Sequence, residues 1–146
     1  MKDVRLRLMQ NLGLLLAVCL FLLFWLTYNF NHPRGFSTVV FVQNANEAFV
    51  LAMVAMAQTV PVLMGGLDLS VGSVMTLVNC IASVLINGSA SQMLFGVVVC
   101  LAAGTAAGFV NGLVVVYGRI QPIIATLAAG AIYMGIALFI RPTPGG

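Results

Sequence analysis

Charged side chains are scarce in this sequence. Its 146 residues include six basic and three acidic ones, which is 6% of the chain, whereas ordinary soluble domains carry about 25%. So few charges cannot cover the surface of a water-soluble fold of this size, which excludes a soluble globular domain. Disorder is excluded as well, because 62% of the residues are hydrophobic and a solvated coil needs low hydrophobicity. The composition therefore predicts an integral membrane protein.

Side chains suited to catalysis or metal binding are also few. The chain has one histidine, three acidic residues and three cysteines, namely His32, Asp3, Glu47, Asp68, Cys19, Cys80 and Cys100. The cysteines lie inside apolar runs without pairing or metal-ligand spacing, so we expect them to be small buried hydrophobes. We expect no metal site and no cofactor in this chain, and the composition argues against an enzyme.

Long apolar runs make up most of the chain. At about 20 residues for each membrane crossing, the length holds about five helices, and we predict an all-α, polytopic transmembrane helical bundle. The expected order is a cytoplasmic N-terminus at 1–11 and a transmembrane domain at 12–146, with spans at about 12–30, 46–66, 69–87, 93–117 and 122–140.

The basic residues set the expected orientation. Lys2, Arg5 and Arg7 precede the first apolar run, and basic residues collect on the cytoplasmic side of membrane helices. That run ends in Trp25 and Tyr28, which is typical of a membrane interface and not of a signal-peptide cleavage site. We therefore predict an uncleaved first helix with a cytoplasmic N-terminus.

The segment 65–73, GGLDLSVGS, is the most unusual part of the sequence. It combines Gly65, Gly66 and Gly72 with Asp68 and Ser70, and the apolar runs on both sides are short. Short, glycine-interrupted apolar segments indicate discontinuous helices beside a transport pathway. We therefore expect the second and third helices to be broken around this segment, and its five named residues are candidates for lining or gating a translocation path.

Asp68 has two interpretations at this stage. It is either a structural N-cap, where a carboxylate is favoured at the positive end of the helix dipole, or a pathway residue at a broken helix. The two roles are compatible if the capped helix begins inside the membrane.

A ladder of small residues runs along the fourth apolar segment, at 93–117. Gly104, Gly108 and Gly112 recur every four residues, and such a stripe lets two helices approach closely in lipid. The alternative is a span that tolerates glycine without a special partner. Asn111 lies beside the ladder, where it is either an interhelical hydrogen-bond residue or a pathway-lining candidate.

Three segments carry a family resemblance when they are taken in order. They are GGLDLSVGS at 65–73, AAGFVNGL at 106–113 and IQPIIATL at 120–127. Together they resemble ribose-type, monosaccharide ABC transporter permeases, with an isoleucine at position 123 where that family more often has phenylalanine. Within the third segment, Pro122 and Thr126 are expected to start the fifth helix, because proline suits a first turn and the threonine hydroxyl can bond back to a carbonyl.

The resemblance implies a function and a set of partners. It implies a permease subunit of a bacterial importer in the cytoplasmic (inner) membrane, forming part of the translocation path for a monosaccharide or similar carbohydrate. The implied partners are a second permease chain, cytoplasmic ATPase subunits that use ATP, and a periplasmic sugar-binding protein. The lipid bilayer is the surrounding medium, and no nucleic acid is expected as a partner.

The length departs from the family, whose members are longer. We therefore expect the N-terminal half of such a permease, apparently truncated. A different class of function also stays open, that of a small structural or regulatory helical membrane protein that packs against other membrane helices through its glycine ladder.

Overall fold

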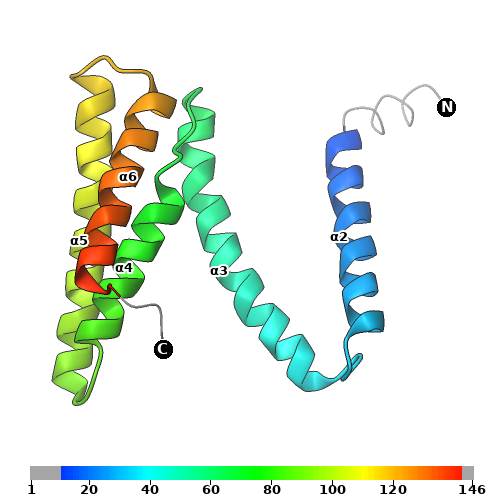
Figure 1. Ribbon diagram of the computed structural model, residues 1–146. Coiled ribbons are helices and arrows are strands. Elements are labelled where there is room, and N and C mark those ends of the chain that lie inside the picture. Colours follow the sequence, from blue (N-terminus) through cyan, green and yellow to red (C-terminus); the bar gives the residue numbers. More distant parts are fainter. Residues whose placement is uncertain (1–10, 143–146) are drawn as a thin grey trace. The chain divides into compact units, whose positions relative to one another are not determined.

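The computed structural model describes residues 11–142, and all its regular elements are helices, as predicted (Figure 1). The helices are α2 (Leu12–Asn31), α3 (Thr38–Leu63), α4 (Val71–Leu85), α5 (Ala90–Val116) and α6 (Pro122–Ile140). The expected cytoplasmic N-terminus lies outside the described residues, except for Asn11.

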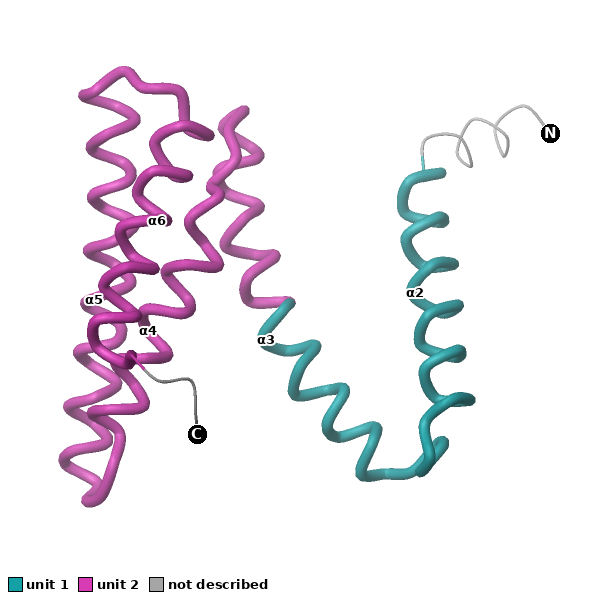
Figure 2. Tube along the Cα trace, in the orientation of Figure 1, with its two compact units in different colours: residues 1–51 teal, residues 52–146 magenta. Residues whose placement is uncertain are grey.

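The chain divides into two compact units (Figure 2). The first, Met1–Leu51, contains α2 and the first part of α3. The second, Ala52–Gly146, contains the rest of α3 and the helices α4, α5 and α6.

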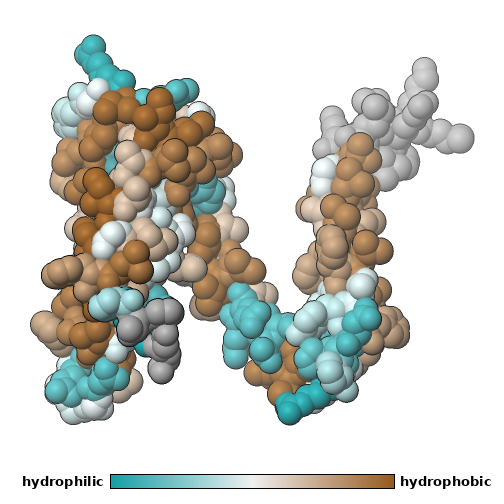
Figure 3. Space-filling view, in the orientation of Figure 1, coloured by the Kyte–Doolittle hydropathy of each residue, from teal (hydrophilic) through white to brown (hydrophobic). Residues whose placement is uncertain are grey.

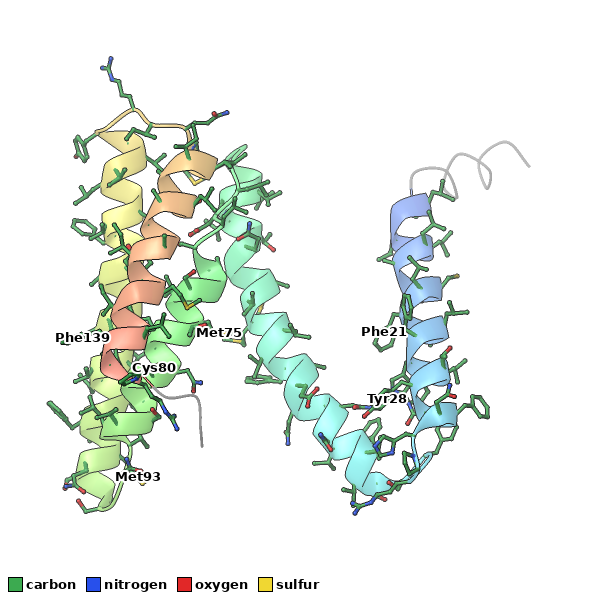
Figure 4. The ribbon with its side chains drawn as sticks, in the orientation of Figure 1. Phe21, Tyr28, Met75, Cys80, Met93 and Phe139 are labelled. Atoms are coloured by element: carbon green, nitrogen blue, oxygen red, sulfur yellow. The ribbon has the colours of Figure 1, made fainter. Side chains whose placement is uncertain are left out.

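Four helices, α2, α3, α5 and α6, are long and apolar enough to cross a membrane. Large apolar side chains cover their outer faces, and Figure 3 shows apolar colour over most of the helical surface. Phe21 of α2 and Phe139 of α6 project away from their helices (Figure 4), and Phe139 is 88% exposed. Such a surface is compatible with lipid and not with water, as the composition predicts.

Helix α3 begins earlier than the expected span at about 46. Its first residue is Thr38, and the hydroxyl of Ser37 accepts a hydrogen bond from the Val40 amide at 3.4 Å. This contact satisfies one of the free amides of the first turn. The expected span starts later because a hydropathy pattern detects the apolar core of a span and misses a polar helical extension.

Helix α3 ends in a glycine-dependent turn. Gly65 has φ +78°, its amide donates to the Val62 carbonyl at 3.0 Å, and the Gly66 amide donates to the Pro61 carbonyl at 2.9 Å. This pair of bonds is the Schellman pattern, which places a left-handed residue just after the helix. The glycine at 65 therefore ends α3 and turns the chain toward α4.

Helix α4 packs against both α5 and α6. The buried core of these three helices consists of Leu77, Ala107, Tyr133 and Ala137. At 15 residues, α4 is about 22 Å long, which is too short for the roughly 30 Å hydrocarbon core of a bilayer. Helix α4 alone therefore cannot cross the hydrocarbon core, and the segment that precedes it has to cover the remaining thickness.

The small-residue ladder of α5 does not form one straight face. A Cβ added at Gly96 would lie 2.6 Å from Cγ1 of Ile86, and one at Gly104 would lie 3.8 Å from Cγ2 of Val78. A Cβ added at Gly108 or Gly112 would meet no atom of the described chain within 4 Å. Residues four apart on an α-helix are rotated by about 40° relative to each other. Gly96 and Gly104 therefore face α4, while Gly108 and Gly112 turn away from it.

This difference predicts unequal effects of valine substitutions. Gly96→Val should lower the free energy of unfolding by about 1–3 kcal/mol, because the new side chain overpacks the contact with α4. Gly108→Val is the matched control and should change stability little. Thermal unfolding of the detergent-solubilised chain, followed by circular dichroism, measures both; equal losses for the two variants would contradict the assigned face.

Candidate functional site

The non-helical segment 64–70 runs alongside the first half of α6. A Cβ added at Gly66 would lie 3.1 Å from Cγ of Pro122, the first residue of α6. One added at Gly130, eight residues further along α6, would lie 3.5 Å from Cα of Ser70. Eight helical residues rise about 12 Å, so the segment descends by about that distance before α4 begins.

This descent brings the start of α4 to the level of the middle of α6. Helix α6 has 19 residues and is therefore about 28 Å long, close to the thickness of the hydrocarbon core. The start of α4 lies beside Gly130, which is well inside that span. Irregular backbone at such depth is tolerated only where it is buried in protein or lines a watery cavity.

Side chains from two flanking helices bond three backbone groups of this segment. The Leu69 amide donates to Oγ1 of Thr126 at 2.9 Å. With its side-chain amide turned so that the nitrogen faces the Asp68 carbonyl, Gln58 can donate to that oxygen at 3.1 Å and accept from the Asp68 amide at 3.3 Å. Helices α3 and α6 therefore hold the segment between them through side-chain to backbone hydrogen bonds.

A continuous chain of hydrogen bonds joins α4, α5 and α6 at the same level. Oδ1 of Asp68 accepts from the Ser70 amide at 2.8 Å and from the Ser70 hydroxyl at 2.6 Å. Nδ2 of Asn111 donates to the Ser70 hydroxyl at 2.7 Å. The Tyr133 hydroxyl lies 3.1 Å from Oδ1 of Asn111 and 2.9 Å from the Ala107 carbonyl, and its single proton serves one acceptor at a time.

This chain, which we call the polar cluster (Asp68, Ser70, Asn111 and Tyr133), is largely buried. Ser70 is fully buried, and Asn111 and Tyr133 are 5% and 8% exposed. Every fully buried side-chain nitrogen or oxygen of the described residues has a partner. A buried polar network that is fully satisfied holds one arrangement of its helices, because each lost bond strands a partner.

The structure brings together three residues that the sequence singled out. Asp68, Ser70 and Asn111 lie in the polar cluster, and Thr126 contacts the same segment through the Leu69 amide. Ser70, and not Asp68, occupies the N-cap position of α4. Asp68 stabilises that position from two residues upstream, so the carboxylate acts on the helix start without being the capping residue.

The remaining predicted residues have backbone and packing positions. Gly65 ends α3 and Gly66 lies against Pro122, which is at the start of α6 as expected. A Cβ added at Gly72 would meet no described atom within 4 Å, and Gly104 packs on α4 while Gly108 and Gly112 have open space. Their proposed roles in gating and packing stay predictions.

Sequence reasoning missed Gln58 and Tyr133. Each is a polar side chain inside an apolar run, and a buried amide or phenol needs a hydrogen-bond partner. Tyr133 also lies seven residues after Thr126, which places both on the same face of α6. That spacing was the available signal, but it does not tell which helix supplies the partner.

The chemistry of the site is that of hydrogen bonding. Its groups are hydroxyls, amides and one half-buried carboxylate. Within residues 11–142, His, Cys, Asp and Glu form no group of three that could hold a metal ion. Such a donor set is suited to holding helices in a defined arrangement and to contacting an uncharged polar solute.

Comparison with known proteins identifies the family. Residues 40–145 match the family described as "Branched-chain amino acid transport system / permease component". The match covers most of the chain, including the segment 64–70 and helices α4, α5 and α6. No solved structure gives a significant match.

Three curated relatives are similar over most of this chain. The ribose import permease protein RbsC of Escherichia coli (strain K12) is 36% identical over 92 residues, which is 63% of this chain and 28% of that protein. The D-allose transport system permease protein AlsC of the same strain is 31% identical over 103 residues, 70% of this chain and 30% of the relative. The autoinducer 2 import system permease protein LsrC of Yersinia pestis (strain Pestoides F) is 33% identical over 108 residues, which is 72% of this chain and 30% of that relative.

The matched part is thus less than a third of the length of each of these relatives. The relatives confirm the resemblance to monosaccharide ABC permeases that the ordered motifs indicate. The chain, with its four apolar helices and its short α4, belongs to this family of permease components of ABC transport systems.

Proposed function

We propose that this chain is a membrane-spanning permease subunit of a bacterial ABC importer and forms part of the translocation path for a monosaccharide or similar carbohydrate. The observation that carries the proposal is the start of α4 beside the middle of α6, held by the polar cluster, which supports a helix that begins inside the membrane. Import permeases for ribose and D-allose among the relatives support the class of substrate.

The mechanism follows from the segment 64–70. Helices α3 and α4 are joined there by backbone whose last three residues, 68–70, are held by side-chain hydrogen bonds. Hydrogen bonds of this kind can be exchanged for bonds to water or to a polar solute at small net cost. Helices on either side of the segment would therefore shift between inward-open and outward-open arrangements as these side-chain hydrogen bonds are exchanged.

The proposal includes partners that supply energy and substrate. ATPase subunits on the cytoplasmic side would hydrolyse ATP, a second permease chain would complete the path, and a periplasmic sugar-binding protein would deliver the substrate. This chain would perform no covalent chemistry and needs no cofactor of its own. The basic residues before α2 support a cytoplasmic N-terminus in the inner membrane.

The direct test is gene deletion and complementation in the source bacterium. Loss of uptake of one labelled monosaccharide, restored by this chain, is the expected result. Unchanged uptake of every pentose and hexose tested would contradict the proposal. Purification from the same cells adds a second measurement: a partner permease or ATPase supports import, and a homo-oligomer without either supports a packing protein.

Asp68→Asn separates the charge of the carboxylate from its structural contacts. Asparagine keeps an oxygen that can accept from Ser70, so the helix start should persist, but the negative charge is lost. Hydrogen bonds to a charged group contribute about 1.5–3 kcal/mol, and we expect uptake to fall by at least about tenfold while the chain still folds.

Glu47→Gln is the matched control, because it makes the same change at an exposed carboxylate of α3 outside the polar cluster. It should leave uptake near the level of the natural chain. Unchanged uptake in Asp68→Asn would reduce that carboxylate to a replaceable helix-start residue and remove it from the path.

The polar cluster also predicts coupled stability effects. Asn111→Ala strands the Ser70 hydroxyl, and Tyr133→Phe removes the group that contacts Oδ1 of Asn111. Each should lower the free energy of unfolding by about 0.5–2 kcal/mol, and the double variant should lose less than the sum because the two share a bond. Thermal unfolding in detergent measures the cycle; strict additivity would contradict the hydrogen bond between them.

A further inference from the structure

A small cavity lies within the first unit, where α2 ends and α3 begins. Its volume is about 290 Å³, and it is lined by Trp25, Asn29, Phe36, Ser37, Thr38 and Phe41. None of these residues belongs to the polar cluster. At about 30 Å³ for each water molecule, the volume corresponds to about ten waters, which is room enough for a small polar solute.

Aromatic rings form the apolar side of this cavity. The rings of Trp25 and Phe36 meet edge to face, with centroids 5.7 Å apart and an interplanar angle of 69°. Phe36 is also packed edge to face against Phe30 at 5.4 Å. These contacts fix the orientation of the rings, and rigid ring faces are suited to packing against the C–H groups of a compact solute.

Asn29 provides a buried polar group in the same cavity. The residue is 3% exposed, and its Nδ2 donates to the Trp25 carbonyl at 2.7 Å. No described residue donates to its Oδ1. Since no described side-chain oxygen is both fully buried and unpaired, this Oδ1 keeps an accessible surface. This oxygen is therefore free to accept a hydrogen bond from water or from a bound hydroxyl group.

Two hydroxyl groups complete the polar side. Ser37 accepts from the Val40 amide through its hydroxyl oxygen, so its proton remains able to donate. Thr38 adds a second hydroxyl at the first residue of α3. The six lining residues include no charged side chain, which disfavours a charged ligand. Aromatic faces opposite hydroxyl and amide groups match a neutral molecule that has both C–H and O–H surfaces.

We infer that this cavity is a binding site for one neutral monosaccharide or sugar-like polyol, packed on Trp25 and Phe36 and hydrogen-bonded to Asn29. A pentose or a hexose is small enough for a cavity of about 290 Å³. The inference rests on the proposed function, in which a cytoplasmic N-terminus puts this end of α2 on the periplasmic side. There the site would hold substrate before it enters the translocation path.

The chain carries its own probe for this site. Trp25 is the single tryptophan, so the intrinsic fluorescence of the purified chain in detergent reports on this cavity. Titration with D-ribose and with D-glucose should give a saturable change in emission for at least one sugar. Asn29→Ala should weaken that response by about tenfold or more, since one hydrogen bond to a largely buried group contributes about 1.4 kcal/mol.

Asn31→Ala is the matched control, because Asn31 is exposed and its amide bonds only the Thr27 carbonyl. It should bind like the natural chain. If Asn29→Ala does not fold, Thr38→Val decides the question, since it removes a lining hydroxyl at nearly constant volume and should weaken the response.

Three results would overturn the inference. They are no saturable change with either sugar up to about 100 mM, an unchanged response in the folded Asn29→Ala or Thr38→Val variant, and an equal change on adding phospholipid alone, which would indicate a lipid headgroup. Uptake in the complementation experiment does not depend on this readout. Intact sugar uptake with no response of Trp25 would therefore reject the site and keep the proposed function.

Discussion

The structure depends on one constraint, that backbone amides and carbonyls inside a membrane need partners within the protein. Regular helices meet this requirement through their own hydrogen bonds. Residues 67–70 of the segment 64–70 cannot, because they descend beside α6 without helical structure. Thr126, Gln58 and the Asp68 carboxylate supply partners instead. A few polar side chains in an otherwise apolar chain thus allow a helix to begin at depth.

The short length of α4 and the position of the polar cluster are two aspects of this arrangement. Because α4 is only about 22 Å long, the descending segment has to cover the rest of the bilayer. Its end at Ser70 brings a helix N-terminus, with its free amides and partial positive charge, next to the only carboxylate of the second unit. The N-cap interpretation of Asp68 is wrong in its residue, because Ser70 is the N-cap and Asp68 stabilises it from two residues upstream, and the pathway interpretation stays a prediction.

The sequence predicted the class of fold and much of the site. Low charge and long apolar runs identify membrane helices, and the glycine-rich segment with Asp68, Ser70 and Asn111 is where the structure gathers its buried polar groups. It could not show that Tyr133 and Gln58 supply the partners, because which helices meet is a tertiary property. The ladder of small residues was also less uniform than its spacing suggested, since an α-helix rotates by 40° beyond one turn at each fourth residue.

Hydrogen exchange of the whole chain in lipid nanodiscs tests the central claim most directly. If Thr126 and Asp68 pair with the descending backbone, the amides of Leu69 and Ser70 should exchange as slowly as those in the middle of α4. The turn that contains Gly88 provides the fast reference, and Thr126→Val should accelerate Leu69 selectively. Exchange of Leu69 and Ser70 as fast as that of Gly88 in the natural chain would show a segment open to water, and would contradict the account.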